Sequence, residues 1–324
     1  MKIGVIGAAK IAATVSPAIV GSPGLEAWAV ASRDLKKAQD FAAKYGFQKA
    51  YGSYEELVSD PEVELVYVAT PHSHHYEHMM LALTHGKPVL SEKAFTMNAD
   101  QARKIAAYAR EHHLFAAEAI WTRYMPSRPK INELIASGVI GRVNTLTANL
   151  SYPIWEVPRL YRPDLCGGAL LDIGVYDLNF ALMHFGKDIE RIETAVEFTD
   201  TGVDGMEVNT LFYRDGRMAV LTNSIFARSD RKGIIHGDKG YIVVENFNDP
   251  QSVSVFNRKD ELVEHYDFPH RINGYEYEFL ECARCIREGL TEAPSMPLSD
   301  SIEVMELMDY IRSRWGYRFP MEQN

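Results

Sequence analysis

The sequence is poor in cysteine and lacks a long apolar run. Only three cysteines occur among 324 residues, at positions 166, 282 and 285, so a disulfide-stapled fold is excluded. Cys282 and Cys285 have redox-motif spacing but lie inside a predicted helix, which favours thiols on a helix face. No stretch is long and apolar enough to span a bilayer. The start of the chain has no basic segment, apolar core and cleavage site, so a reducing cytoplasm is the expected location.

The sequence also has no excess of basic residues over acidic ones. The chain has 34 Lys and Arg against 44 Asp and Glu, a formal net charge of −10. This balance argues against nucleic acid or an anionic membrane as the main partner. Residues 1–120 are nearly neutral, with 12 basic and 13 acidic residues, so they are the better host for an anionic cofactor. The length indicates about two domains.

Apolar runs alternate with helical patterns through the first 120 residues. Strands are expected at residues 3–6, 26–31, 65–69, 89–91 and 115–119, with a very short one near Ala50, and helices at residues 11–20, 34–45, 53–59, 74–85 and 100–112. Alternating strands and helices imply right-handed crossovers and a parallel sheet, on which ligands bind beyond the carboxyl ends of the strands. We therefore expect an α/β, doubly wound Rossmann domain over residues 1–121.

The pattern changes after residue 121. Strands are expected at residues 143–152, 192–198, 207–213, 218–225, 234–237, 241–246, 252–257 and 262–266, and helices at residues 126–136, 167–184, 274–288 and 299–315. Closely spaced strands with tight turns favour a largely antiparallel sheet. Residues 122–324 are thus expected to form an α+β domain that binds substrate. Its open sheet face must be covered, and a homodimer or homotetramer through this sheet would cover it.

The chain opens with the pattern of a dinucleotide-binding turn. Lys2–Ile6 is an apolar, β-branched run, Gly7 interrupts it, and the residues from Ala9 onward form helices readily. Backbone N–H groups and the helix dipole at such a junction favour a pyrophosphate. Against the G-x-G-x-x-G/A pattern, Ala9 replaces the second glycine, and Ala12 is an accepted third residue. Alone, the stretch also fits a buried strand followed by an ordinary turn.

The residues after the second strand bear on the choice of dinucleotide. NAD enzymes usually place a carboxylate here for the ribose 2′-hydroxyl, whereas a 2′-phosphate is matched by Arg or a small hydroxyl residue. Ser32 and Arg33 suit the phosphate, and Asp34 is explained as the N-cap of the next helix. NADP is therefore the expected cofactor, with NAD as the alternative.

The histidine-rich segment from Ala69 to His78 has two interpretations. His74, Glu77 and His78 fit the inverted zinc-protease motif H-x-x-E-H. However, the segment follows a predicted parallel strand and opens a crossover helix, which places Thr70–His72 at the cofactor edge of the sheet. We favour polar residues beside the nicotinamide or its ribose, and we expect no metal.

The next strands end in charged and aromatic residues at the same edge. Lys93 follows the strand at residues 89–91, and Trp121 and Arg123 follow the last strand of the parallel sheet. Further along, Asp172 and Tyr176 are four residues apart, hence on one face of an otherwise apolar helix. A carboxylate there indicates function, although the Asp and Tyr could also simply satisfy each other or nearby backbone.

Together these stretches resemble the glucose–fructose oxidoreductase/inositol dehydrogenase family, in particular its branch of dimeric dihydrodiol dehydrogenase-like proteins. The motifs that carry the resemblance are Gly4–Ala12, Ala31–Asp34, Ala69–Pro71 with His75, Glu92–Lys93, Gly167–Tyr176 and, typical of the dihydrodiol branch, Glu118–Arg123. Two positions depart from family patterns. Ala94 replaces the Pro of Glu-Lys-Pro, which is expected to loosen the lysine slightly. Tyr176 stands where many sugar dehydrogenases have His, as expected of the dihydrodiol and glucose–fructose branch.

The resemblance implies an NAD(P)-dependent oxidoreductase that moves a hydride between the nicotinamide and a carbinol or carbonyl carbon of a sugar, polyol or vicinal diol. It implies Lys93, Tyr176 and Asp172 as the catalytic group, with the immediate proton donor, Lys93 or Tyr176, left open. To titrate near neutral pH, the tyrosine pKa must fall from about 10 by roughly 3 units, or about 4 kcal/mol. A lysine ammonium about 4 Å away supplies that order of energy at an effective dielectric of about 20.

The resemblance also implies a cofactor site. Its expected members are Gly7, Ala8, Ala9, Lys10, Ile11, Ser32, Arg33, Thr70, Pro71, His72, His75, Glu92, Lys93, Trp121 and Arg123. The loop at residues 151–162 is rich in aromatic residues and arginine, which suits a polyol, a sugar ring or an arene diol. Its candidate substrate residues are Trp155, Arg159, Tyr161 and Arg162. The loop could instead serve packing or a subunit contact, and a non-catalytic NADP-binding sensor is the alternative function.

Overall fold

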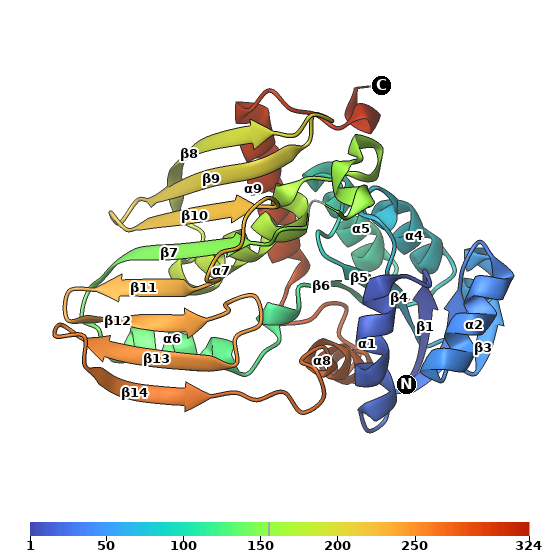
Figure 1. Ribbon diagram of the computed structural model, residues 1–324. Helices are drawn as coiled ribbons and strands as arrows, with labels where there is room; N and C mark the ends of the chain where they lie inside the picture. The colour runs from blue at the N-terminus through green and yellow to red at the C-terminus, as the bar shows by residue number, and fades with distance from the viewer. Residues whose placement is uncertain (155, 324) are drawn as a thin grey trace. The chain divides into compact units, whose positions relative to one another are not determined.

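The computed structural model describes residues 1–154 and 156–323. These residues form two compact units (Figure 1). The first unit comprises residues 1–124 and 271–306, and the second comprises residues 125–270 and 307–324. Helix α9 (Leu298–Arg314) begins in the first unit and ends in the second.

The first unit contains a six-stranded parallel sheet. Its strands are β1 (Lys2–Ile6), β2 (Glu26–Ala31), β3 (Lys49–Tyr51), β4 (Leu65–Val68), β5 (Val89–Glu92) and β6 (Ala116–Ala119). Their order is β3-β2-β1-β4-β5-β6, and every neighbouring pair is parallel. This is the strand order of the doubly wound dinucleotide fold, so the predicted Rossmann domain is confirmed.

Side-chain caps set several helix starts in this unit. The helices are α1 (Lys10–Gly21), α2 (Leu35–Tyr45), α3 (Tyr54–Ser59), α4 (His72–Thr84), α5 (Ala99–Glu111) and the short 3₁₀ helix η1 (Trp121–Arg123). The Asp34 carboxylate accepts from the Lys37 N–H, as its predicted N-cap role requires. Ser53 and Glu56 form a reciprocal capping box that fixes α3.

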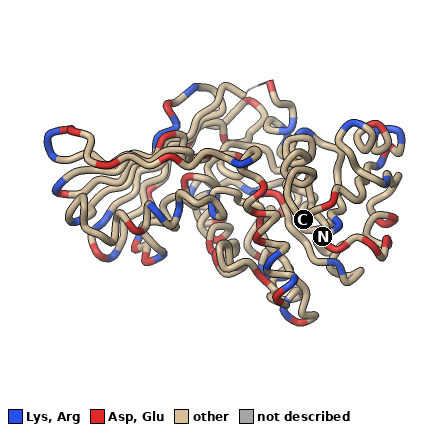
Figure 2. The backbone as a smooth tube through the Cα atoms, turned by 90° about the horizontal axis from the view of Figure 1, so that it is seen from below, with Lys and Arg blue, Asp and Glu red and all other residues tan. Residues whose placement is uncertain are grey.

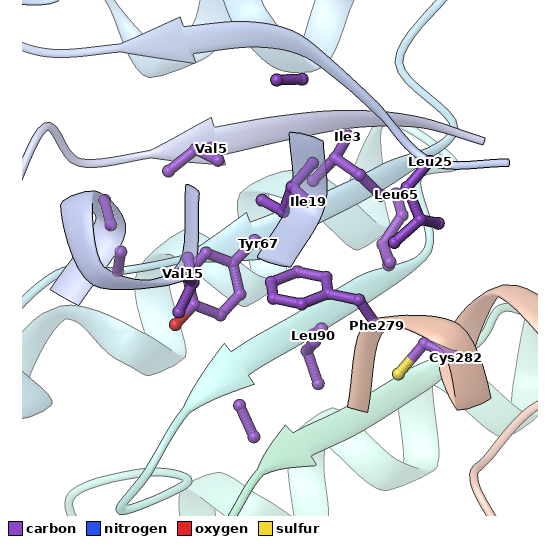
Figure 3. Close-up of a cluster of buried hydrophobic side chains, with 14 of the residues drawn as sticks. Ile3, Val5, Val15, Ile19, Leu25, Leu65, Tyr67, Leu90, Phe279 and Cys282 are labelled. Atoms are coloured by element: carbon purple, nitrogen blue, oxygen red, sulfur yellow. The ribbon is translucent and has the colours of Figure 1, made fainter. Parts of the chain in front are cut away.

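Residues 271–306 correct the expected domain boundary. The sequence predicts one division, between residues 121 and 122, but the chain returns to the first unit with helix α8 (Glu276–Arg287). Phe279 and Cys282 are fully buried in the core of the parallel sheet, and the Phe279 ring centroid lies 5.1 Å from that of Tyr67 (Figure 3). Burial of this apolar helix face explains why the segment belongs to the sheet that begins the chain.

The second unit contains an eight-stranded sheet. Its strands are β7 (Val143–Ser151), β8 (Ile189–Phe198), β9 (Asp204–Tyr213), β10 (Met218–Ser224), β11 (Gly233–Gly237), β12 (Gly240–Glu245), β13 (Ser252–Asn257) and β14 (Leu262–Asp267). The order is β14-β13-β12-β11-β7-β10-β9-β8. The expected antiparallel sheet is confirmed except at one pair, because β7 lies between β10 and β11 and runs parallel to β10.

Helices cover one face of this sheet. Helices α6 (Ser127–Ser137) and α7 (Val175–Phe185) pack against its strands (Figure 1). The continuous helix expected at residues 167–184 differs in its first part, where Leu170–Gly174 forms a π-helical turn that precedes α7. Short 3₁₀ helices occur at Pro158–Tyr161, Pro163–Leu165 and Pro320–Glu322.

One expectation about apolar stretches is wrong. The segment Pro163–Phe185 is long and apolar enough to cross a membrane by length and composition. However, 89% of its most apolar window is buried inside the structure, which is the behaviour of a core helix in a folded domain. Its apolar character is therefore explained by packing against the eight-stranded sheet.

Replacing Phe279 by Ala tests the assignment of α8 to the first unit. We expect the free energy of unfolding to fall by about 3–5 kcal/mol, because the substitution leaves a cavity beside Tyr67. Urea unfolding followed by circular dichroism measures the change. Leu290→Ala is the control, since Leu290 is 38% exposed just beyond α8. A loss for Phe279→Ala no larger than that of the control would contradict the assignment.

Candidate functional site

Gly7 joins three strand ends at the carboxyl edge of the parallel sheet. Its φ of +104° lies in a region that side-chain-bearing residues avoid, and an added Cβ would lie 2.9 Å from the carbonyl oxygen of Ala69. Its N–H donates to the carbonyl oxygen of Ala31 at 3.0 Å. The ends of β1, β2 and β4 therefore meet at one edge, as the sequence pattern predicts.

The start of α1 is suited to an anion. Ala9 precedes the helix, donates its N–H to the carbonyl oxygen of Gly7 at 2.9 Å and provides no side-chain cap. The N–H groups of Lys10 and Ile11 thus begin a helix without a capping side chain within the described residues. Such donors fit a pyrophosphate, and the buried Ala8 keeps the turn compact.

The end of β2 carries the residues expected to select the dinucleotide. Ser32 is buried, and its hydroxyl accepts from the N–H of Asp34 at 3.3 Å. Arg33 is exposed; burial lowers the pKa of His78, and the Arg33 charge adds to that fall. The Asp34 carboxylate caps α2, so the acidic side chain of this turn is engaged with the helix backbone. This set suits a 2′-phosphate.

His75 links the segments that follow β4 and β5. It is fully buried, with Nε2 2.8 Å from the carbonyl oxygen of Thr70 and Nδ1 2.8 Å from that of Ala94. Burial lowers the pKa of His75 to about 4, while the contacts with the Thr70 and Ala94 carbonyl oxygens oppose the fall. The His75 ring therefore connects the Thr70–Pro71 corner to the residue after Lys93.

The neighbouring histidines do not assemble a metal centre. Among the described residues, no group of three or more His, Cys, Asp or Glu side chains is placed to hold a metal ion. His78 Nδ1 lies 2.9 Å from the Thr70 hydroxyl, the His74 and His78 rings stack at 5.7 Å, and Glu77 is exposed. His72 is buried at the start of α4. The zinc-hydrolase interpretation thus lacks a ligand set in this part of the chain.

Lys93 follows β5 beside buried acids. Lys93 is half-buried and directly follows Glu92, which accepts a short hydrogen bond from the Tyr67 hydroxyl. Glu278 of α8 is fully buried, and burial, with the nearby Glu92 charge, raises its pKa well above the ordinary value. We did not predict Tyr67 or Glu278 as site residues. The signal available for Glu278 was a carboxyl four residues before Cys282 on the buried face of its helix.

A third buried acid ends β6. Burial raises the pKa of Glu118 to about 7, while the nearby Ser301 hydroxyl and the charge of Arg123 oppose the rise. The Arg123 guanidinium is buried and pairs with Asp300 at 2.6 Å. The Trp121 ring stacks on Tyr275, with centroids 4.2 Å apart. These two residues, expected to bind cofactor, thus anchor the end of β6 to the segment at residues 271–306.

Asp172 and Tyr176 lie one helical turn apart in the second unit. Asp172 belongs to the π-helical turn and is 6% exposed, whereas Tyr176 in α7 is half-buried. The Asp172 carboxylate accepts from Arg159 Nη2 at 2.8 Å. Arg159, expected from sequence as a substrate residue, therefore compensates the charge of a predicted catalytic residue. Single-turn π-helical segments often occur at functional sites.

The other candidate substrate residues lie near Arg159 in sequence. Tyr161 is half-buried, and burial raises its pKa. Arg162 is exposed and forms an ion pair with Asp164. Trp155, also expected to contact substrate, lies outside the described residues.

Comparisons with known proteins identify the family. Residues 1–119 match the model described as an oxidoreductase family with an NAD-binding Rossmann fold, and residues 129–243 match the GFO/IDH/MocA C-terminal domain. The chain is 37% identical over 302 residues to trans-1,2-dihydrobenzene-1,2-diol dehydrogenase of Xenopus laevis, covering 90% of each chain. It is 35% identical over 309 residues to the Homo sapiens protein of that name, covering 91% of this chain and 90% of the relative.

A solved structure extends the comparison to three dimensions. The chain is similar to a 3-ketoreductase from Actinomadura kijaniata in complex with NADP and TDP-benzene, with a TM-score of 0.88, 28% identity and coverage of 97% of both chains. All three of these relatives are named as enzymes, and none as a sensor. The chain therefore belongs to the GFO/IDH/MocA family of NAD(P)-dependent oxidoreductases.

Proposed function

We propose that the protein uses NADP to interconvert a carbinol and a carbonyl carbon in a vicinal diol, polyol or sugar, with a trans-dihydrodiol as the first substrate to test. The observation that carries the proposal is the Asp172–Tyr176 pair, which presents a buried, charge-compensated carboxylate and a phenol one turn apart. Likeness along 90% of the chain to a dihydrodiol dehydrogenase supports the diol as substrate.

The cofactor is assigned to the first unit. The turn from Gly7 to Ile11 would hold the pyrophosphate. Ser32 and Arg33 would hold the ribose 2′-phosphate. The nicotinamide end would be held by Thr70–His72, Glu92 and Lys93. His75, Trp121 and Arg123 support these segments through the contacts described above. When bound, the nicotinamide ring accepts or donates the hydride.

The protein's own residues handle the proton. Tyr176 removes the proton from the substrate hydroxyl during oxidation and returns it during reduction. Asp172 accepts a hydrogen bond from a substrate hydroxyl and orients it, while the Arg159 guanidinium donates to the same carboxylate. Arg159, Tyr161, Arg162 and Trp155 form the proposed recognition loop for the ring and its hydroxyl groups.

Tyr176→Phe tests the acid–base assignment. We expect kcat for oxidation of trans-1,2-dihydrobenzene-1,2-diol to fall by about 10²–10⁴, the usual contribution of a positioned acid or base. The dissociation constant of NADPH, measured by fluorescence, should not change. Tyr310→Phe, at a 44% exposed position in α9, is the matched control.

The same series separates the tyrosine from the lysine. If Tyr176→Phe keeps near-normal turnover while Lys93→Met loses it, Lys93 is the proton donor. If wild-type protein binds NADPH but oxidises or reduces no diol, hydroxyketone, dicarbonyl or sugar, the proposed function is wrong and the sensor alternative stands.

Arg33→Ala tests the preference for NADP. We expect KM for NADP to rise by about 10- to 150-fold, corresponding to the 1.5–3 kcal/mol of a hydrogen bond to a charged group, while KM for NAD stays close to its wild-type value. Lys36→Ala is the control, because Lys36 is exposed on α2. An equal loss for both dinucleotides would show that Arg33 does not read the 2′-phosphate.

We also propose that the protein works in the cytoplasm. Cys166, Cys282 and Cys285 are buried free thiols, a state that a reducing compartment maintains. Cell fractionation with an antibody checks this, and recovery of the protein in an oxidising compartment would refute it.

We propose a homodimer, or a homotetramer built from it, through the open face of the eight-stranded sheet. Along β9, Met206 is 47% and Val208 40% exposed, whereas the alternate residues Glu207 and Asn209 are buried. Val208 pairs with Thr222 of β10, so the outward surface continues onto the next strand. β10 carries no charged residue, and β9 carries none after Glu207; Figure 2 colours the Lys, Arg, Asp and Glu positions along the backbone. This partly apolar face, which adjoins Glu193 and Glu197 of β8, suits a second copy of the chain.

Val208→Arg tests this interface. We expect the measured mass in light scattering to fall toward that of a monomer, because apposed copies would place two arginines in an apolar interface. Val20→Arg, on the exposed side of α1, is the control. A Val208→Arg protein with unchanged mass would place any interface elsewhere.

A further inference from the structure

The π-helical turn that carries Asp172 is held from the side by strand β9. The turn (Leu170–Gly174) makes i to i−5 hydrogen bonds, and the N–H of its first residue, Leu170, has no acceptor within the helix, so it needs one from elsewhere. Two buried acids of β9, Asp204 and Glu207, lie against the backbone of this segment. Neither was among the predicted site residues.

Asp204 occupies the space in front of the turn. It is 1% exposed, and its Oδ2 accepts from the N–H of Leu170 at 2.6 Å. At Gly168, where φ is +118°, an added Cβ would lie 2.1 Å from Asp204 Oδ1. Gly168 therefore provides both the backbone conformation and the room that let this carboxyl reach the turn.

Glu207 occupies the corresponding space at the end of the turn. It is 1% exposed, and an added Cβ at Gly174 would lie 2.5 Å from its Oε1. The Asn223 side-chain amide of β10 donates to the same oxygen at 3.2 Å and so fixes the carboxyl. Asp172 thus lies between two glycines, each of which admits a carboxyl from β9.

We propose that Asp204 and Glu207 are positioning residues for the redox reaction: they hold the π-helical turn so that Asp172 and the following Tyr176 keep the geometry that catalysis needs. The proposal rests on the proposed roles of Asp172 and Tyr176. Neither β9 residue is assigned a contact with substrate, so each acts through the turn.

The surroundings favour uncharged acids at this place. Burial raises the pKa of Glu207 well above its ordinary value, with the Asp204 charge adding to the rise, and burial raises the pKa of Asp204 to about 7. Burial and the Glu207 charge likewise raise the pKa of Asp177 in α7. A protonated Glu207 can keep its contact with the turn without a buried charge, so Gln is its close neutral mimic.

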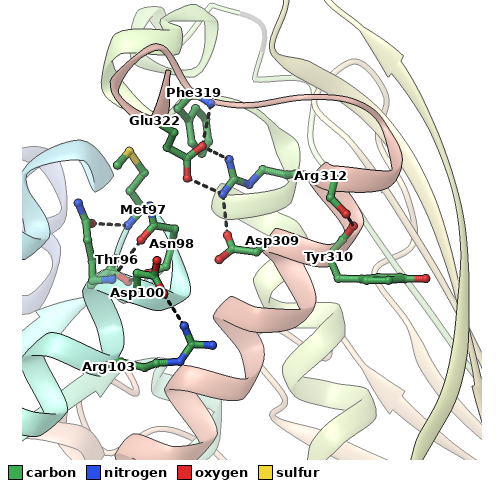
Figure 4. A network of polar contacts seen from close by, with 12 residues as sticks. Thr96, Met97, Asn98, Asp100, Arg103, Asp309, Tyr310, Arg312, Phe319 and Glu322 are labelled. Atoms are coloured by element: carbon green, nitrogen blue, oxygen red, sulfur yellow. Dashed lines mark hydrogen bonds and ion pairs between the residues drawn. The ribbon is translucent and has the colours of Figure 1, made fainter. Parts of the chain in front are cut away.

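One cation and one further titratable group face Asp204 from the end of the chain. The Arg312 charge acts to lower the pKa of Asp204, and the Asp204 charge acts to raise that of Tyr317. The guanidinium is already engaged with Asp309 and Glu322, each at 2.6 Å (Figure 4). The Arg312 charge is therefore shared between Asp309 and Glu322. The hydrogen bond from the Leu170 N–H is what links Asp204 directly to the turn.

The test compares truncation with conservative replacement. Asp204→Ala and Glu207→Ala should lower kcat for the dihydrodiol by about 10- to 100-fold, the effect of a small misplacement of reacting groups, with an unchanged NADPH dissociation constant. Asp204→Asn and Glu207→Gln should restore kcat to near the wild-type value, because the amide oxygen still accepts. Glu193→Ala on the adjacent strand β8, an exposed position, is the control.

Hydrogen exchange supplies a readout that does not need turnover. In the Ala variants, amides in peptides covering residues 166–178 should exchange faster, while peptides of the first unit keep their wild-type rates. If Asp204→Ala does not fold, Glu207→Ala against Glu207→Gln makes the comparison. Wild-type kcat and exchange in the Ala variants would overturn the proposal, as would equal losses in the Ala and amide variants. If the wild-type protein turns over no substrate, the proposed function fails, and the exchange data still decide whether β9 holds the turn.

Discussion

The proposed cofactor site depends on one constraint, which is that backbone segments approach one another closely at the carboxyl edge of the parallel sheet. Gly7 tolerates φ of +104° and lies so near the Ala69 carbonyl that no Cβ fits. With that contact made, the turns after β1 and β4 share one edge with the end of β2. The uncapped start of α1 then lies at the same edge as Arg33 and Thr70, which is the arrangement that the proposed pyrophosphate and 2′-phosphate contacts require.

Burial of acidic side chains is a second constraint, and it occurs in both units. Glu118 and Glu278 lie inside the first unit, as Asp204 and Glu207 do inside the second. Removing a carboxylate from water costs several kcal/mol, so each group either takes up a proton or gathers donors. Such groups add little to stability compared with apolar residues. These buried acids instead determine local geometry, because each one fixes the position of the backbone or side chain that it contacts.

Local patterns predicted most of the fold, and long-range packing explains what they missed. Alternation of apolar residues and capping residues such as Asp34 act within a few positions, so strands and helices were found within a few residues of their ends. The return of Phe279 to the first core depends on a surface far away in sequence, which periodicity does not contain. The Arg159–Asp172 ion pair was missed for a related reason, because both residues were assigned to substrate and their contact depends on how the loop folds.

Three glycines, Gly7, Gly168 and Gly174, lie where a group from a distant part of the chain approaches the backbone closely. From sequence, Gly7 indicates a tight turn, and Gly168 and Gly174 merely flank an apolar helix that contains Asp172. In the structure, each marks a place where a group from another strand reaches the backbone: the Ala69 carbonyl at Gly7, the Asp204 carboxyl at Gly168 and the Glu207 carboxyl at Gly174. A glycine beside a candidate catalytic residue is therefore a reason to search distant strands for the side chain that fills its space. In this chain that search leads from Asp172 to β9, which carries no predicted catalytic residue.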